Sequence, residues 1–168
     1  MNSAVCLDRL SDRELLRRTG ELAVRGRRVE AALIAHMAEV DRRKLYRGEA
    51  CSSMFAYAIE RLRLSESQAY DRITVARASR RFPVLLEMIG DGRLTLTAAS
   101  KLGPHVTREN AGELLERAVH GTRRQVEALV AEVAPKPDAP SSIRRLPGPS
   151  APAPQASAGA ASPQDPVG

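Results

Sequence analysis

Apolar residues recur along this chain at intervals of three, four and seven, the spacing that places side chains on one face of an α-helix. From Ser11 to Leu45 no proline interrupts this pattern. The apolar stripe in this stretch consists of Leu15, Leu22, Val29, Leu33 and Val40. It predicts a single N-terminal helix of about 33 residues and about 50 Å, which braces a bundle or pairs with another helix. Gly48 is expected to close it in the left-handed conformation.

Shorter helices with their own N-caps are predicted to follow. Ser65 and Thr122 each stand three residues before a glutamine, Gln68 or Gln125, which is the arrangement of a capping box. The predicted helices cover residues 54–62, 66–81, 84–89, 98–102, 107–120 and 122–134. No stretch alternates apolar and polar residues over several positions, so no sheet is expected. The fold class is therefore all-α, with a long N-terminal helix bracing a multi-helix bundle.

The composition changes sharply at Pro135. Nine of the 11 prolines lie at or beyond it, among Ala, Ser and Gly, and such a tract cannot bury enough apolar surface to fold. We expect a flexible N-terminus at 1–10, a helical domain at 11–134 and a disordered linker or tail at 135–168. Two bulky apolar residues and two arginines in 142–146 favour docking of that short segment onto the domain or a partner.

The pair of helices within 53–81 is the candidate functional element, because a short break at 63–65 gives it the form of a helix-turn-helix. Six arginines and only two acidic residues lie between Arg61 and Arg81. The second helix of a DNA-binding helix-turn-helix enters the major groove, where Gln can pair with adenine and Arg with guanine. The predicted base-edge contacts are Ser67, Gln68 and Arg72, and the predicted phosphate contacts are Arg61, Arg63, Arg77, Arg80 and Arg81. The outward positions of this helix are predicted to be Ser67, Asp71, Thr74 and Ala78.

Overall charge agrees with this interpretation without establishing it. The net charge is +6 and the isoelectric point about 10.0, which favours a polyanionic partner. An Arg- and Ala-rich composition gives the same charge in proteins with other roles, and two capped helices with a short break also occur in ordinary bundles. No apolar run approaches the roughly 20 residues that span a membrane, and no signal pattern opens the chain. We therefore expect no membrane association and a cytoplasmic location.

Candidate catalytic chemistry is sparse. His36, His105 and His120 are isolated in the sequence, and Cys6 and Cys51 have no metal-site spacing. No Ser/His/Asp or Cys/His arrangement and no phosphate-binding loop is recognisable. The sequence therefore predicts no catalytic residue, no metal site and no cofactor.

Four segments together resemble a known family. They are residues 36–46 (HMAEVDRRKLY), 52–57 (SSMFAY), 80–86 (RRFPVLL) and 134–147 (APKPDAPSSIRRLP). From about Leu10 to Pro147 the chain resembles the N-terminal helical region of bacterial HNH-endonuclease-type proteins, in which a C-terminal HNH nuclease module follows the linker. Residues 64–102 also resemble the helix-turn-helix and following helices of ParB-type partition proteins, which bind DNA.

The resemblance implies a DNA-binding or accessory role, and whether the chain is catalytic is left open, with catalysis by this chain alone the least favoured hypothesis. An HNH site needs a histidine base and metal ligands, and this sequence has no such cluster, so no catalytic residue is transferred from the family. Two hypotheses follow. In the first, the domain binds double-stranded DNA, as a homodimer through its long helix if two-fold symmetry is needed. In the second, it is a non-catalytic protein-interaction or oligomerisation module with no nucleic-acid role.

Overall fold

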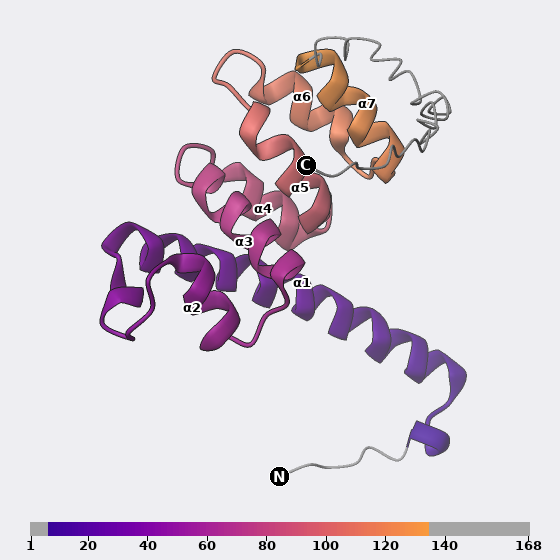
Figure 1. Ribbon diagram of the computed structural model, residues 1–168. Coiled ribbons are helices and arrows are strands. Elements are labelled where there is room, and N and C mark those ends of the chain that lie inside the picture. Colours follow the sequence, from indigo (N-terminus) through magenta and orange to yellow (C-terminus); the bar gives the residue numbers. More distant parts are fainter. Residues whose placement is uncertain (1–6, 135–168) are drawn as a thin grey trace, which may run out of the picture. The chain divides into compact units, whose positions relative to one another are not determined.

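A computed structural model describes residues 7–134, and within that range every regular element is helical (Figure 1). In chain order the α-helices are α1 (Asp12–Arg43), α2 (Met54–Glu60), α3 (Glu66–Ser79), α4 (Val84–Asp91), α5 (Leu96–Leu102), α6 (Ala111–Ala118) and α7 (Arg123–Val133). Three short 3-10 turns accompany them: η1 (Leu7–Arg9), η2 (Leu45–Arg47) and η3 (Gly103–His105). The all-α fold and the long N-terminal helix are confirmed. The predicted tail, with its docking segment at 142–146, lies outside the described residues, and η1 falls within the stretch expected to be flexible.

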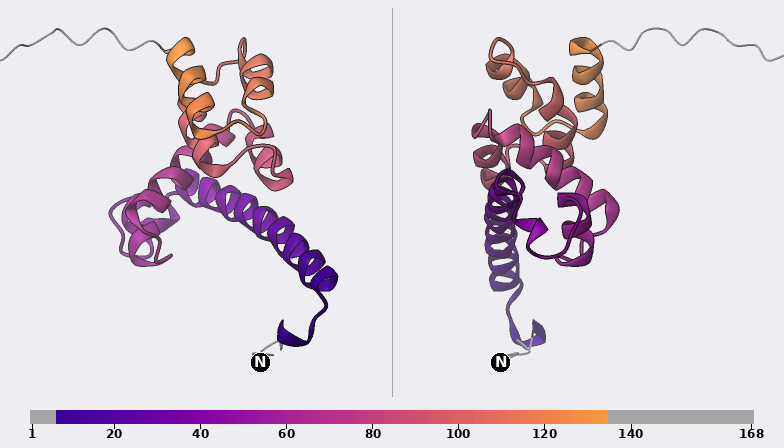
Figure 2. Two further views of the ribbon diagram at one scale, coloured as in Figure 1. Left: turned by 90° about the vertical axis from the view of Figure 1, so that its right-hand side faces the viewer. Right: turned by 60° about the vertical axis from the view of Figure 1, so that its left-hand side comes forward.

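The two halves of α1 have different surroundings. The C-terminal half packs on α3 and α4 and buries Ile34, Met37 and Ala38. The N-terminal half extends away from the other helices (Figures 1 and 2), and its Leu16 and Leu22 are 74% and 63% exposed. The apolar stripe thus braces the bundle only over its C-terminal part, because within residues 7–134 no other helix covers the rest.

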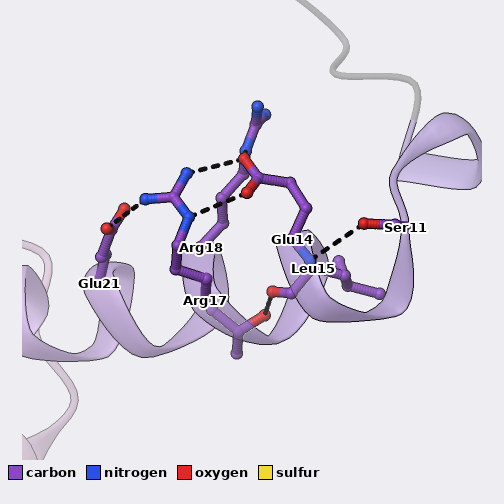
Figure 3. A network of polar contacts seen from close by, with 7 residues as sticks. Ser11, Glu14, Leu15, Arg17, Arg18 and Glu21 are labelled. Atoms are coloured by element: carbon purple, nitrogen blue, oxygen red, sulfur yellow. Dashed lines mark hydrogen bonds and ion pairs between the residues drawn. The ribbon is translucent and has the colours of Figure 1, made fainter.

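The first turns of α1 are stabilised by contacts within the helix (Figure 3). Ser11 Oγ accepts a hydrogen bond from the Glu14 backbone N–H at 3.3 Å. Glu14 in turn accepts hydrogen bonds from Arg17 and Arg18, which lower the pKa of its carboxyl to about 2. Its side chain therefore faces the arginines and does not complete a capping box with Ser11. These local pairs stabilise the N-terminal half of α1, which does not pack against the core of the domain.

The end of α1 differs from the prediction. The left-handed residue is Lys44, with φ 56°, and its backbone N–H bonds the carbonyls of Val40 and Asp41. Gly48 has φ −66° and ends η2 instead. The expectation based on glycine was wrong because α1 ends four residues earlier, where a lysine adopts the strained conformation.

The core lies where α3 meets its neighbours. α3 contacts α1, α2, α4, α5 and η3, and α7 completes the bundle by packing on α5 and α6. The largest fully buried side chains come from six different helices and are Ile34, Met37, Met54, Val75, Leu85, Leu102 and Val126. Aliphatic residues fill this core, as the low aromatic content of the sequence predicts. The arrangement fixes α3 on one side and leaves its other side open.

Gly103 sets how closely η3 approaches α3. A Cβ added at Gly103 would lie 2.9 Å from the Ala78 Cβ, closer than two carbon atoms can pack. We expect Gly103→Ala to lower the free energy of unfolding by about 1–3 kcal/mol, because overpacking forces the backbone to shift. Urea denaturation measures this. The matched control is Gly112→Ala, at an exposed position of α6 where a Cβ meets nothing within 4 Å. There Ala should raise the free energy of unfolding by up to about 1 kcal/mol. Equal effects at the two sites would contradict the close packing at Gly103.

Candidate nucleic-acid interface

The α2–α3 pair begins with side-chain caps, as predicted. Ser53 accepts from the Ala56 N–H at 3.0 Å at the start of α2. At the start of α3 the Ser65–Gln68 capping box is complete, with hydrogen bonds of 3.3 and 3.2 Å in the two directions. Between the helices Arg63 adopts φ 57°, at a point where such turns often use glycine. The local sequence therefore defines both helices and the turn of the candidate element.

One face of α3 is open to solvent, and its residues follow three–four spacing along the helix. The exposed side chains on this face are Ser67, Tyr70 and Arg77, with half-buried Thr74 between them. Arg81 extends the face beyond the last turn. Tyr70 is 65% exposed, and it lines a groove of about 340 Å³ together with Thr74, Arg77, Arg81 and the η3 residues Gly103 and Pro104. Tyr70 is absent from the predicted site, although counting by three and four from Arg63 would have found it.

The predicted outward orientation of Ala78 was wrong. Ala78 is only 5% exposed, because Gly103 packs directly over it. A small apolar residue such as alanine occurs on both buried and exposed faces of helices, and the prediction from the sequence put Ala78 on the exposed face. The exposed face of α3 is thus rotated toward Tyr70 relative to the prediction.

Two of the predicted base-edge residues make hydrogen bonds within the domain, Arg72 in a half-buried position and Gln68 at the surface. Arg72 pairs with Glu30 of α1. The Nε–Oε1 distance is 2.9 Å, and Nη2 donates a hydrogen bond of 2.9 Å to Oε2. Its side chain is 12% exposed and that of Glu30 25%. Gln68 uses its amide oxygen in the capping box. Of the three residues predicted to read bases, Ser67 alone stands on the open face without such a commitment among the described residues.

The predicted phosphate contacts all reach the surface, but two of them have carboxylate partners. Arg77 is 61% exposed, and its Nε donates to Asp41 of α1 at 2.9 Å. Arg61 donates to the Glu49 carbonyl at 2.8 Å, and its Nε lies 3.8 Å from the carboxylate of that residue. Each pair holds a guanidinium in place while leaving further N–H donors directed to solvent.

Arg80 and Arg81 lie at the C-terminal end of α3 and are exposed. The Arg81 guanidinium carbon is 5.8 Å from the centre of the Phe82 ring, a cation–π distance. Both arginines line a pocket of about 440 Å³ with residues 106–109, which lead into α6. Arg108 of this loop brings a third guanidinium to the pocket. The sequence could not have predicted its presence there, since only the fold brings this loop beside α3.

The open side of α3 borders a second, larger groove. This groove, of about 750 Å³, is lined by Tyr70, by η3 and by one side of α7. Across its wall Lys101 Nζ of α5 donates to Glu127 of α7 at 2.7 Å. Arg123 also donates to Glu127, and the two cations lower the pKa of its carboxyl to about 2, with Lys101 as the larger cause. The Lys101–Glu127 pair thus connects α5 and α7, whose residues line this groove.

Lys101→Met should raise the pKa of Glu127 from about 2 toward its ordinary value of 4.5. In the wild type, a carboxyl with a lowered pKa contributes stability above its unfolded pKa, and that contribution is lost as pH falls from about 4.5 to about 2. Carboxyl-carbon NMR titration measures the pKa directly. Arg124→Met, which removes an exposed cation from the same helix, is the control. An unchanged Glu127 titration in Lys101→Met would show that the α5–α7 pair does not form in solution.

The three histidines lie in separate parts of the fold, in α1, in η3 and after α6. His36 is exposed, and its Nδ1 lies 2.7 Å from the Ala32 carbonyl of its own helix, while the His120 backbone N–H bonds the Arg93 carbonyl. Within residues 7–134, no three His, Cys, Asp or Glu side chains gather in a way that could hold a metal ion. Over the same range, no helix combines the length and apolar character required to cross a membrane.

Comparison of the chain with protein-family models, with curated proteins and with solved structures finds no match. The resemblance to HNH-endonuclease-type and ParB-type proteins stays a prediction from the sequence.

Proposed function

We propose that this helical domain binds double-stranded DNA through the open face of α3. The observation that carries the proposal is the alignment of Ser67, Tyr70, Thr74, Arg77 and Arg81 along one side of a capped helix. α3 has 14 residues, about 21 Å at the helical rise of 1.5 Å per residue, which fits a major groove. Hydroxyl groups toward its N-terminus face the bases, and arginines toward its C-terminus contact phosphates.

The assignment revises the residues expected to read bases. Tyr70 and Thr74 join Ser67 in the groove, because all three lie on the open face. Arg72 is left out, because its guanidinium is held against α1 by Glu30. Arg63 precedes this face and adds positive charge at the turn. In the fuller form of the proposal, the domain targets an HNH-type nuclease to DNA, and this part of it rests on the sequence resemblance.

Fluorescence anisotropy of a labelled duplex, titrated with the protein at low salt, tests DNA binding. Saturable binding that weakens in Tyr70→Ala supports the proposed face. The control is Val133→Ala, which removes an exposed apolar side chain from the last turn of α7. Binding that is equally strong in the Tyr70 variant and the wild type would remove α3 from the interface, and an absence of binding at low salt would contradict the function itself.

A second function is favoured by the N-terminal half of α1. Its exposed apolar residues include Leu15 and Leu22, and Val29 near the middle of the helix continues their spacing of seven. In an antiparallel pair centred on Leu22, the Leu15 of each copy meets the Val29 of the other, which makes the surface self-complementary in the manner of a two-fold interface. We propose homodimerisation through this surface, either in support of DNA binding or as the main role of the domain.

Leu22→Glu should convert the dimer into a monomer, because two carboxylates would face each other at the centre of the apolar contact. Analytical ultracentrifugation measures the mass across a concentration series. Leu45→Glu is the matched control, since Leu45 is also exposed, at 51%, but follows α1 in η2. A wild type that sediments as a monomer throughout the series would contradict the proposed dimer.

A further inference from the structure

A polar pocket at the C-terminal end of α3 collects three arginines from two separate segments. Arg80 and Arg81 follow the last residue of α3, and Arg108 comes from the loop before α6. The pocket has a volume of about 440 Å³, and Phe82, Val106, Thr107 and Glu109 complete its wall. Because all three arginines line the same pocket, its wall carries several positive charges that a bound anion would offset.

These arginines differ from many others in the molecule in having no internal counter-charge. Elsewhere carboxylates pair with arginines, for example Glu30 with Arg72 and Glu132 with Arg117. Within residues 7–134, none of the three pocket arginines lies within 4.0 Å of a carboxylate oxygen. The pocket therefore presents unneutralised guanidinium donors, which match the charge and geometry of a phosphate group.

The one acidic residue of the pocket wall is already engaged. Hydrogen bonds from the Thr107 hydroxyl and from its own backbone N–H lower the pKa of the Glu109 carboxyl. Glu109 stays charged, but three guanidinium groups outnumber it. Arg81 is further oriented by the Phe82 ring, which reduces the entropy lost when the side chain binds an anion.

Arg81 also belongs to the groove along the open face of α3, so the pocket continues that face. We propose that Arg80, Arg81 and Arg108 bind a phosphate group, which in the complex with DNA is a backbone phosphate beside the groove occupied by α3. This inference rests on the proposed function for the source of the phosphate. It extends the proposed interface from the open face of α3 to Arg108 and the loop at 106–109.

The test compares Arg108→Ala with Arg124→Ala, which removes the same charge from an exposed position on α7. Anisotropy titrations use two labelled duplexes of unrelated sequence, and side-chain Nε NMR resonances of the arginines are followed during titration with inorganic phosphate. We expect Arg108→Ala to lower the affinity for both duplexes by the same factor, about five- to tenfold. The magnitude of the slope of log affinity against log salt should fall by about 0.9, the value for one phosphate contact. Arg124→Ala should change affinity less than about twofold.

The two titrations separate the sources of the phosphate. In one outcome, Arg108→Ala leaves duplex affinity unchanged, while inorganic phosphate shifts the resonances of the pocket arginines in the wild type and not in the variant. The pocket then binds a free phosphate. If neither titration responds to the substitution, the pocket proposal is overturned, while the loss of duplex binding in Tyr70→Ala would still support the proposed function. A wild type that fails to bind duplex contradicts the proposed function, and the phosphate titration then decides the pocket alone.

Discussion

Replacing Arg77 and Arg81 together with alanine should weaken duplex binding about 100-fold at low salt. Both side chains are exposed at the C-terminal end of the open face. Hydrogen bonds to charged groups contribute about 1.5 kcal/mol or more each, and 1.4 kcal/mol corresponds to a tenfold change in affinity. The slope of log affinity against log salt should fall by about 2, because two phosphate contacts are lost. Anisotropy titrations at several salt concentrations measure both quantities.

The control for this pair is Arg117→Ala/Arg124→Ala, which removes two exposed positive charges from α6 and α7. It separates a loss of specific contacts from a general loss of charge. Because Arg77→Ala also leaves Asp41 without its partner, circular dichroism and urea denaturation should accompany the titrations. Equal losses of affinity in the two double variants would contradict an interface on α3 and would leave only non-specific attraction.

Glu30→Ala should lower the free energy of unfolding by about 2–3 kcal/mol. It leaves the Arg72 guanidinium, only 12% exposed, without its carboxylate, and removing one partner of a buried pair costs about 3–5 kcal/mol. The expected loss is smaller here because Glu30 retains 25% of its side-chain exposure. Urea denaturation monitored by circular dichroism measures the change.

Glu30→Leu/Arg72→Met provides the comparison, since replacing both members of a buried pair with apolar groups is often close to neutral. This double variant should regain most of the stability lost in Glu30→Ala, and it should bind duplex as the wild type does. Retained binding distinguishes a structural Arg72 from one that reads bases. A large loss of affinity in a stable double variant would restore Arg72 to the interface and overturn the rotation assigned to α3.

Local signals in the sequence were sufficient for the beginnings of several helices. The prediction was wrong for the helix at 107–120, which begins at Ala111 and has no side-chain cap. A capping box depends on two residues three positions apart, and Ser65 with Gln68 and Thr122 with Gln125 form theirs as predicted. Proline-free apolar periodicity likewise predicted the length of α1, which has 32 residues. These features need no knowledge of the rest of the fold.

The remaining features of the candidate site depend on contacts between distant segments. Glu30 precedes Arg72 by 42 positions, and nothing in either local sequence shows that they pair. Burial of Ala78 depends on Gly103, and the third arginine of the pocket depends on where the loop before α6 lies. Periodicity also shows which face of α1 is apolar without showing whether another helix covers it. For these reasons the sequence predicted α3 as a helix but misplaced part of its exposed face.

The most direct test of the central claim is the affinity of the wild-type protein for duplex DNA across a series from low to physiological salt. If α3 and its arginines contact the backbone, log affinity should fall linearly with log salt. The slope should be about −2 for one phosphate at Arg77 and one in the pocket of Arg80, Arg81 and Arg108, and about −3 if Arg63 contacts another. A duplex affinity that is negligible even at low salt would contradict the account and would leave assembly through α1 as the function of the domain.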